Sequence, residues 1–372
     1  MLENLPEREF DVLGIGEVML RLSPEGKDRI SQSESFEKCA GGSELNVVSG
    51  ISQLGLRTGI VTRLPDNEIG KFIKNKIRYT GTSDDFVTYD SSPEKRLGIY
   101  YYERGAYPRV SVVAYDRTDS SFVRFSLDEL DPGIFQSCKI FHLSGITLAL
   151  GENLRRQVIE MIRRFHENGT QISFDVNYRA ALWSEEEAKK TIEQILPFVN
   201  LLFISEETLR RMLGRKGELK EIHRALAKEY PALQMIASTQ RTVISPTRHD
   251  FGSLVYDVKE DRHYAEEPYR EIEVVDRLGS GDAYVAGALY GVLSYHDIEH
   301  AAQFGDAMAA IKNTIPGDMT VCDIHDVTRI INAHLSTGPK KRNGPLILKM
   351  RAVRMKPNGS FYLKRITRLS FS

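Results

Sequence analysis

Short runs with β-strand character alternate repeatedly with longer runs of helical periodicity, and this alternation constrains the fold more than any other feature. The strand-like runs are residues 10–20, 57–64, 139–143, 171–177, 201–205, 233–239, 253–258 and 271–276. The helical runs include residues 43–54, 68–79, 154–165 and 282–295, and a further helix is expected after Ser184, where Ser184 and Glu187 fit a capping box. Such alternation is typical of parallel strands covered by helices. The sequence therefore predicts an α/β fold with a mainly parallel central sheet.

Two tyrosine-rich runs interrupt this pattern, at residues 97–103 and 109–116. They are too polar for strands buried on both faces of a parallel sheet. We expect them to form a separate antiparallel layer with one face in water.

Composition excludes several classes of protein. Of the 372 residues, 41% are hydrophobic and 27% charged, which is ordinary for a globular chain and excludes a fibrous or largely disordered one. No apolar run approaches the roughly 18 residues that span a bilayer, and the first residues lack the pattern of a signal peptide. Cys39, Cys138 and Cys322 are far apart and form no CxxC pair. We therefore expect no disulfide framework, no zinc site and a cytoplasmic location.

Charge is distributed unevenly. Residues 337–372 contain ten Lys or Arg and no Asp or Glu, which leaves 40 basic and 51 acidic residues in the remainder. An acidic body argues against nucleic-acid binding, and the absence of an apolar span argues against a membrane partner. The β-like runs 346–355 and 360–371 flank Lys356-Pro-Asn-Gly359, so the basic extension over 336–372 is expected to form a hairpin or to be a disordered tail.

The strongest chemical motif is Asp276-Arg-Leu-Gly-Ser-Gly-Asp282, between a β run and a helix. Glycines at the start of a helix expose backbone N–H groups, which together with the helix dipole favour an anion. The positive end of the helix is expected to keep Asp282 ionised at neutral pH. Such a weakly basic carboxylate suffices in phosphoryl transfer, where proton removal comes late. The alternative is a structural glycine turn with Asp as a helix cap.

Two other glycine motifs are less specific. Gly14-Ile-Gly16-Glu17 lacks the third glycine of a dinucleotide-binding fingerprint and gives faint support to a dehydrogenase. Gly41-Gly42 opens a helix that carries Asn46, which suits close approach of a polar ligand but equally suits a plain helix start.

Taken in order, the motifs resemble the PfkB, or ribokinase-like, family of sugar kinases over about residues 10–335, and most closely its 2-keto-3-deoxygluconate kinases. The stretches that carry the resemblance are Gly16–Pro24, Gly41-Gly42 with Asn46, Val113–Arg117, Phe141–Thr147, Phe174–Trp183, Asp276–Asp282 and Thr314–Asp318.

The resemblance implies a ribokinase-like αβα sandwich with a small β-strand lid at about residues 17–38 and 97–117. It also implies a kinase that uses ATP and Mg²⁺ on a small-molecule sugar acid, and a homo-oligomer formed through the lid. In such a kinase Asp282 would be the catalytic base, and Gly279, Ser280 and Gly281 would supply the amides of an anion hole. The implied substrate-binding residues are Gly41, Gly42, Asn46, Tyr100, Tyr115, Arg117, Asn177, Arg179 and Asp318.

The residue types agree with an acidic sugar. The planar donor fork of Arg117 or Arg179 suits a carboxylate, and Tyr100 and Tyr115 add hydroxyl donors and apolar ring faces. The alternative is that both arginines form surface ion pairs.

Two stretches depart from the family pattern. Ser205-Glu-Glu-Thr208 stands where many relatives have Asn-x-x-Glu, which bears on metal and phosphate handling. The expected nucleotide loop reads Thr239–Pro246 and lacks glycines, with Arg241 as the basic residue that would face the phosphates. No metal ligand is assigned from the sequence.

We therefore predict transfer of the ATP γ-phosphate to the terminal (6-) hydroxyl of 2-keto-3-deoxygluconate. The alternatives are a PfkB-family kinase for fructose or ribose, and a catalytically silent protein that binds sugar or nucleotide.

Overall fold

The computed structural model describes residues 5–337, 353–355 and 361–363. These residues fall into two compact units, divided between Val327 and Thr328. Three cysteines, Cys39, Cys138 and Cys322, are free thiols. Within the described residues, no helix combines the length and apolar character that crossing a membrane requires.

The first unit is built on a ten-stranded sheet with the strand order β13-β12-β11-β10-β9-β8-β1-β4-β5, and β14 also pairs with β12. The pairs from β5 to β11 are parallel, whereas β12 pairs antiparallel with β11, β13 and β14. The predicted mainly parallel sheet is thus confirmed. Its strands are β1 Phe10–Ile15, β4 Thr58–Pro65, β5 Val87–Asp90, β8 Cys138–Ser144, β9 Gln171–Asp175, β10 Leu201–Phe203, β11 Met235–Ser245, β12 Arg248–Asp257, β13 Arg262–Tyr264 and β14 Tyr269–Glu273.

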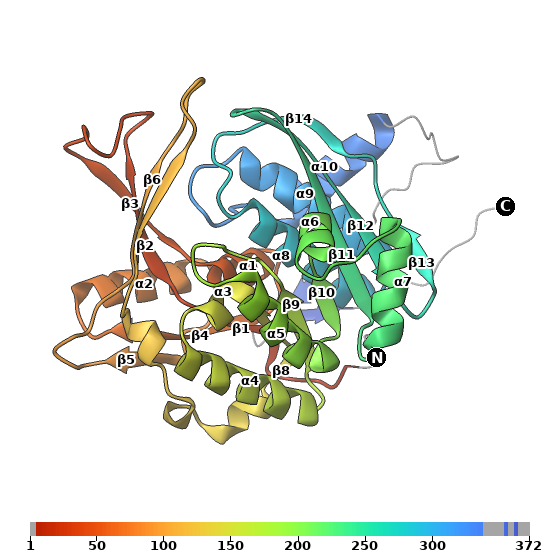
Figure 1. Ribbon diagram of the computed structural model, residues 1–372, viewed down its shortest axis with the longest axis horizontal. Coiled ribbons are helices and arrows are strands. Elements are labelled where there is room, and N and C mark those ends of the chain that lie inside the picture. Colours follow the sequence, from red (N-terminus) through yellow and green to blue (C-terminus); the bar gives the residue numbers. More distant parts are fainter. Residues whose placement is uncertain (1–4, 338–352, 356–360, 364–372) are drawn as a thin grey trace. The chain divides into compact units, whose positions relative to one another are not determined.

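Helices cover both faces of this sheet (Figure 1). Along β1, Gly14 faces α1, whereas Leu13 and Ile15 pack into an apolar cluster with residues of α4. Because side chains alternate along a strand, α1 and α4 lie on opposite faces. The helices are α1 Ser43–Gln53, α2 Glu68–Tyr79, α3 Gly145–Ala149, α4 Glu152–Glu167, α5 Glu185–Ile195, α6 Glu206–Arg211, α7 Leu219–Glu229, α8 Ser280–Tyr295, α9 Glu299–Asn313 and α10 Ile324–Thr337. Short 3₁₀ helices lie at Ser121–Arg124, Leu127–Glu129, Pro132–Gln136 and Leu196–Phe198.

A separate four-stranded sheet, here called the small sheet, projects from the sandwich and is seen at the upper left of Figure 1. Its strand order is β3-β2-β6-β7, with β2 Met19–Pro24, β3 Phe36–Gly41, β6 Ile99–Glu103 and β7 Val112–Asp116. The tyrosine-rich strands β6 and β7 pair antiparallel, as expected from their polarity, but β6 runs parallel to β2. β2 is therefore the link between the two sheets, since it follows β1 directly.

Three local expectations are corrected. The run 10–20 is not one strand: β1 ends at Ile15, and the chain crosses to the small sheet before β2 begins at Met19. The stretch Thr239–Ser245 is not a loop but the end of β11, because it pairs with β12 almost to the turn. Ser184 does cap α5 by accepting from the Glu187 N–H, but the Glu187 carboxylate accepts from Arg155 instead of closing a capping box.

The second unit contains most of α10 and two short strands, β15 Val353–Met355 and β16 Phe361–Leu363. These strands pair antiparallel, with Met355 opposite Phe361, as a hairpin would require. The turn itself, Lys356–Ser360, and the outer parts of both predicted β runs lie outside the described residues.

Candidate active site

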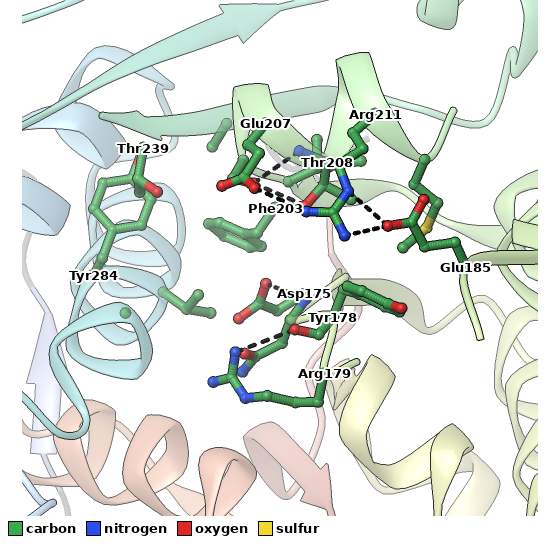
Figure 2. A pocket seen from close by; sticks show the side chains of 17 residues that line it. Asp175, Tyr178, Arg179, Glu185, Phe203, Glu207, Thr208, Arg211, Thr239 and Tyr284 are labelled. Atoms are coloured by element: carbon green, nitrogen blue, oxygen red, sulfur yellow. Dashed lines mark hydrogen bonds and ion pairs between the residues drawn. The ribbon is translucent and has the colours of Figure 1, made fainter. Parts of the chain in front are cut away.

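Two cavities open at the carboxyl ends of the parallel strands, where α/β folds usually bind ligands. The larger, of about 320 Å³, is lined by Asp175 and Phe203 from the ends of β9 and β10, by Ala237 of β11, and by Gly281 of α8 (Figure 2). The smaller, of about 90 Å³, lies between the start of α1, the start of α8 and the small sheet. Asn177 and Arg179 line both cavities, so the two spaces adjoin.

The glycine turn lies at this junction. Gly279 is the N-cap of α8 and has a φ of 80°, in the region that favours glycine. A Cβ at this position would lie 1.9 Å from the Asp318 carbonyl oxygen, so the turn packs directly onto residue 318. Ser280 and Gly281 form the first turn of α8, whose N–H groups have no carbonyl of their own helix to bind. Of the predicted anion-hole residues, Gly279 lines the smaller cavity and Gly281 the larger, whereas Ser280 lines neither and its N–H donates to the Arg277 carbonyl at 3.4 Å.

Asp282 lines the smaller cavity with only 9% of its surface exposed. Its carboxylate accepts hydrogen bonds from Ser43 Oγ and Asn46 Nδ2, each at 2.7 Å. Burial raises the pKa of Asp282, while the two hydrogen bonds and the charge of Arg179 oppose this shift. Burial is the largest of these causes, and the ionisation of Asp282 at neutral pH stays a prediction.

Ser43 extends this hydrogen-bonded group to the other side of the cavity. Asn177 Nδ2 donates to Ser43 Oγ at 3.0 Å, and Asn177 itself has a φ of 35°. Asn46 and Asn177 were both expected at the site. Ser43 was not singled out, although it follows directly on the Gly41-Gly42 pair.

On the side of the small sheet, Tyr100 donates to Asp318 Oδ2, and both residues line the smaller cavity. Burial and the nearby Asp318 charge hold the pKa of Tyr100 well above its usual value, so its hydroxyl remains a donor. Gly41 lies against this pair, since a Cβ there would be 2.3 Å from the tyrosine oxygen. Gly42 lines the same cavity.

Arg117 is already paired inside the smaller cavity. Its Nε donates to Glu17 Oε2 at 2.9 Å, its Nη2 donates to the same oxygen, and Ser120 donates to Oε1. The ion pair considered from the sequence is therefore real for Arg117, although it lies in the cavity rather than on the surface. Tyr115 lines the same space but is 54% exposed.

Arg179 is exposed and lies on the loop between β9 and α5. Its Nη1 donates to the Tyr178 carbonyl at 3.3 Å, and Figure 2 shows its side chain next to Asp175. The base of this loop is anchored by Trp183, which is 5% exposed and whose carbonyl accepts from the Tyr178 hydroxyl. Arg179 is thus the cation best placed to meet an anion at the junction of the two cavities.

Of the two stretches that depart from the family pattern, the first lies at the larger cavity and the second does not supply a lining residue beyond Thr239. Ser205 lines the larger cavity and caps α6, accepting from the Thr208 N–H at 3.1 Å. Glu207 also lines this cavity, whereas Glu206 pairs with Arg210. Arg241 is exposed on β11 and lines neither cavity.

Asp175 was missed as a site residue. It ends β9, lines the larger cavity, and has its pKa raised to about 7 by burial and by the Asp282 charge. The sequence could have pointed to Asp175, because it is an acid at the carboxyl end of a buried strand and lies within the family-like stretch Phe174–Trp183. Within residues 5–337 and the two short strands, no group of three His, Cys, Asp or Glu has the spacing of a metal site. Magnesium needs no such group, since it binds through one or two carboxylates, water and substrate phosphates.

Comparison with known proteins agrees with this geometry. The profile of the pfkB family carbohydrate kinases matches residues 10–324. The 2-dehydro-3-deoxygalactonokinase of Haloferax volcanii is 33% identical over 321 residues, which cover 86% of this chain and 96% of that protein. The 5-dehydro-2-deoxygluconokinase of Shouchella clausii is 27% identical, over 82% of this chain and 90% of that protein.

Solved structures show the same relationship. The 2-dehydro-3-deoxygluconokinase of Thermotoga maritima is 33% identical with a TM-score of 0.82, covering 87% of this chain and 99% of that one. A PfkB family carbohydrate kinase of Listeria grayi has the same identity and coverage and a TM-score of 0.81. The chain therefore has the ribokinase-like fold and belongs to the pfkB family of carbohydrate kinases.

Proposed function

We propose that this sugar kinase transfers the γ-phosphate of ATP to the terminal (6-) hydroxyl of 2-keto-3-deoxygluconate. The observation that carries the proposal is the position of Asp282, which lies in a cavity with Arg117 and Arg179 and next to the glycine turn. Relatives at 33% identity that act on 2-dehydro-3-deoxy sugar acids support the substrate class.

In this proposal the Asp282 carboxylate orients the terminal hydroxyl and accepts its proton as the reaction proceeds. The hydroxyl oxygen forms a bond to the γ-phosphorus, and the bond from that phosphorus to the bridging oxygen breaks, releasing ADP. The N–H groups of Gly279, Ser280 and Gly281 stabilise the charge on the transferring group. Ser43 and Asn46 fix the carboxylate by their hydrogen bonds.

The substrate carboxylate is assigned to Arg179. Glu17 offsets the charge of Arg117 and accepts hydrogen bonds from its Nε and Nη2. The remaining N–H groups of Arg117 would therefore donate to hydroxyl or keto oxygens of the sugar acid. Tyr115 adds a phenol at the mouth of the same cavity, and the Tyr100–Asp318 pair offers polar contacts at its wall. A neutral hexose would leave the Arg179 charge without a counterpart.

The larger cavity is assigned to the ATP phosphates and Mg²⁺. Three carboxylates line it, those of Asp175, Glu185 and Glu207, and the last two also pair with Arg211. Asp175 and Glu207 would hold the ion, directly or through water, and Ser205 and Thr208 add hydroxyls. Bound Mg²⁺ would neutralise part of the phosphate charge. Arg241, on the hairpin of β11 and β12, is proposed to approach the nucleotide phosphates from that side. The small sheet acts as a lid that excludes water during transfer.

A second candidate substrate is 2-keto-3-deoxygalactonate, favoured by the Haloferax volcanii relative. The two sugar acids differ in the configuration of one hydroxyl-bearing carbon. The test is ADP release by the purified chain with both acids, with 5-keto-2-deoxygluconate, and with fructose and ribose. The proposal expects the highest kcat/KM for 2-keto-3-deoxygluconate. Preference for a neutral sugar contradicts the sugar-acid assignment, and binding without turnover favours the silent-binder alternative.

Asp282→Asn separates chemistry from binding in the same assay. Loss of a general base typically costs 10²–10⁴-fold in rate, so we expect kcat to fall by about 1,000-fold while the sugar-acid KM changes little. The control is Asp257→Asn, which removes a buried carboxyl that lines neither cavity. Turnover near the wild-type rate in Asp282→Asn contradicts the assigned base.

A further inference from the structure

Arg21 is a buried cation of the small sheet that no motif assigned to the site. It lies on β2, and its side chain is 1% exposed. Its Nη1 donates to Asp318 Oδ1 at 2.5 Å, its Nη2 to Asp276 Oδ2 at 2.6 Å and its Nε to Ser23 Oγ at 2.8 Å. Its guanidinium carbon also lies 4.4 Å from the ring centroid of Tyr102. All three nitrogens therefore have a defined partner.

The two carboxylates belong to different parts of the site. Asp276 begins the glycine turn, and its Oδ1 accepts from the Leu278 N–H at 3.1 Å, which shapes the turn. Asp318 lines the smaller cavity, accepts from Tyr100, and places its carbonyl against Gly279. Among the residues that the structure describes, Arg21 is the one side chain that binds both carboxylates.

We propose that Arg21 is a positioning residue that holds the Asp318 wall of the sugar cavity and the glycine turn of the anion hole in one fixed arrangement. The inference deepens the proposed function and rests on it. It means that the phosphate-binding turn and the substrate-binding wall are set by a single guanidinium carried by the small sheet. Asp276 is a positioning residue in the same sense, since it acts through the turn.

The chemistry of the side chain explains why arginine is needed. The planar guanidinium presents donors in two directions at fixed angles, whereas a lysine ammonium is a compact charge that cannot hold two carboxylates at the same separation. Burial disfavours the charge of Arg21, but the carboxylates of Asp318 and Asp276 outweigh it and raise its pKa above the ordinary value. A buried ion pair is weak evidence for net stability, and in this proposal its role is to fix one arrangement of the two carboxylates.

A second buried cation supports the same turn without sharing this role. Lys312 Nζ donates to the Asp276 carbonyl at 3.2 Å and to the Ile315 carbonyl at 3.1 Å. Its contacts are with the backbone, so it supports the chain behind the turn. Arg21, in contrast, reaches from the small sheet to the carboxylates of both Asp276 and Asp318.

The test is Arg21→Lys, which keeps the charge but removes the fork. A misplacement of about 1 Å in a catalytic arrangement costs on the order of 100-fold in rate, so we expect kcat/KM for the sugar acid to fall by about 100-fold. The positioning role predicts that kcat falls and the sugar-acid KM rises together. A merely structural role would lower the folded fraction and kcat at an unchanged KM. The matched control is Arg63→Lys, which alters an ion pair with Glu129 away from both cavities and should leave both constants unchanged.

Three outcomes are decisive. Absence of turnover in the wild-type chain contradicts the proposed function and the Arg21 role with it. Wild-type turnover with unchanged KM in a folded Arg21→Lys protein contradicts only the role of Arg21. If Arg21→Lys does not fold, a double-mutant cycle of Asp276→Asn and Asp318→Asn replaces it. Non-additive effects on kcat/KM, by at least about fivefold, support joint positioning, and additive effects overturn it.

Discussion

Two opposed effects act on the pKa of the Asp282 carboxyl, and a substitution can alter one without the other. Burial raises its pKa, and the hydrogen bonds from Asn46 and Ser43 lower it. A base must be deprotonated to act, so kcat falls as pH decreases through the raised pKa. The acid side of the rate profile is therefore expected at higher pH than an ordinary aspartate would give.

Ser43→Ala tests this balance. Removing one hydrogen bond worth about 1 kcal/mol raises the pKa further, so the acid limb of the kcat profile should move up by about one pH unit. The measurement is kcat across pH 5–9 at saturating substrates. Ser49→Ala, on the same helix but bonded to Thr80, is the control and should leave the limb in place. An unshifted limb in Ser43→Ala shows that another group titrates.

The residue scale also shows where sequence reasoning ends. The glycines of the turn and Asp282 could be predicted, because their spacing between a strand and a helix is a local property. The pairing of Arg117 with Glu17 could not, because these residues are 100 positions apart and meet only when β2 pairs with β6. Asp175 belongs to the same class, since its raised pKa arises from burial and from the approach of Asp282, both of which depend on the tertiary fold.

At the scale of elements, most of the helices and strands were predictable from periodicity. α2 matches the expected run 68–79 at both ends, because its cap and apolar spacing are local signals. The break between β1 and β2 was missed, because both are apolar and buried and differ only in the sheet they join. The length of β11 was missed because its outer half is exposed and pairs only with β12.

The glycine turn gives the clearest test at this scale. Gly279→Ala places a methyl group 1.9 Å from a backbone oxygen at a positive φ, so we expect loss of at least about 2 kcal/mol of stability and a large fall in kcat. Gly281→Ala is the matched control, because a Cβ there meets no atom within 4 Å and its melting temperature should stay near wild type. Equal melting temperatures for the two variants would contradict the tight packing of the turn on residue 318.

The packing of α8 against α9 includes a buried acid. Asp306 is fully buried near Tyr284 and Ser253, and burial raises its pKa to about 7. The folded state therefore binds its proton more tightly than the unfolded state, so stability is lost as pH rises from about 4 to 7. Three pK units correspond to on the order of 4 kcal/mol. Asp306→Asn should raise the melting temperature more at pH 8 than at pH 5, and an equal change at both values contradicts this assignment.

At the scale of the molecule, the two adjoining cavities lie beside one glycine turn, which is where the proposed function puts the nucleotide and the sugar. The small sheet closes one of them, and its outer strand β7 pairs on one side only among the described strands. Val112 and Tyr115 on β7 are exposed. Edge strands of this kind readily pair with another chain, and closed symmetric dimers are the commonest assembly.

We therefore keep the prediction that the chain forms a homo-oligomer through the small sheet. Val112→Lys should lower the molar mass measured by light scattering at micromolar concentration. Val243→Lys, also exposed but on β11, is the control and should leave the mass unchanged. A monomeric wild-type chain under the same conditions contradicts the prediction.

Trp183 is the only tryptophan of the chain and is buried at the base of the loop that carries Arg179. Arg155 lies over its ring at 5.2 Å, and Tyr178 is bonded to its carbonyl. The tryptophan fluorescence therefore comes from a single place in the molecule, the base of the loop whose Asn177 and Arg179 line both cavities. Movement of the loop on ligand binding should be readable as a change in emission from the unlabelled protein, without a dye or an engineered probe.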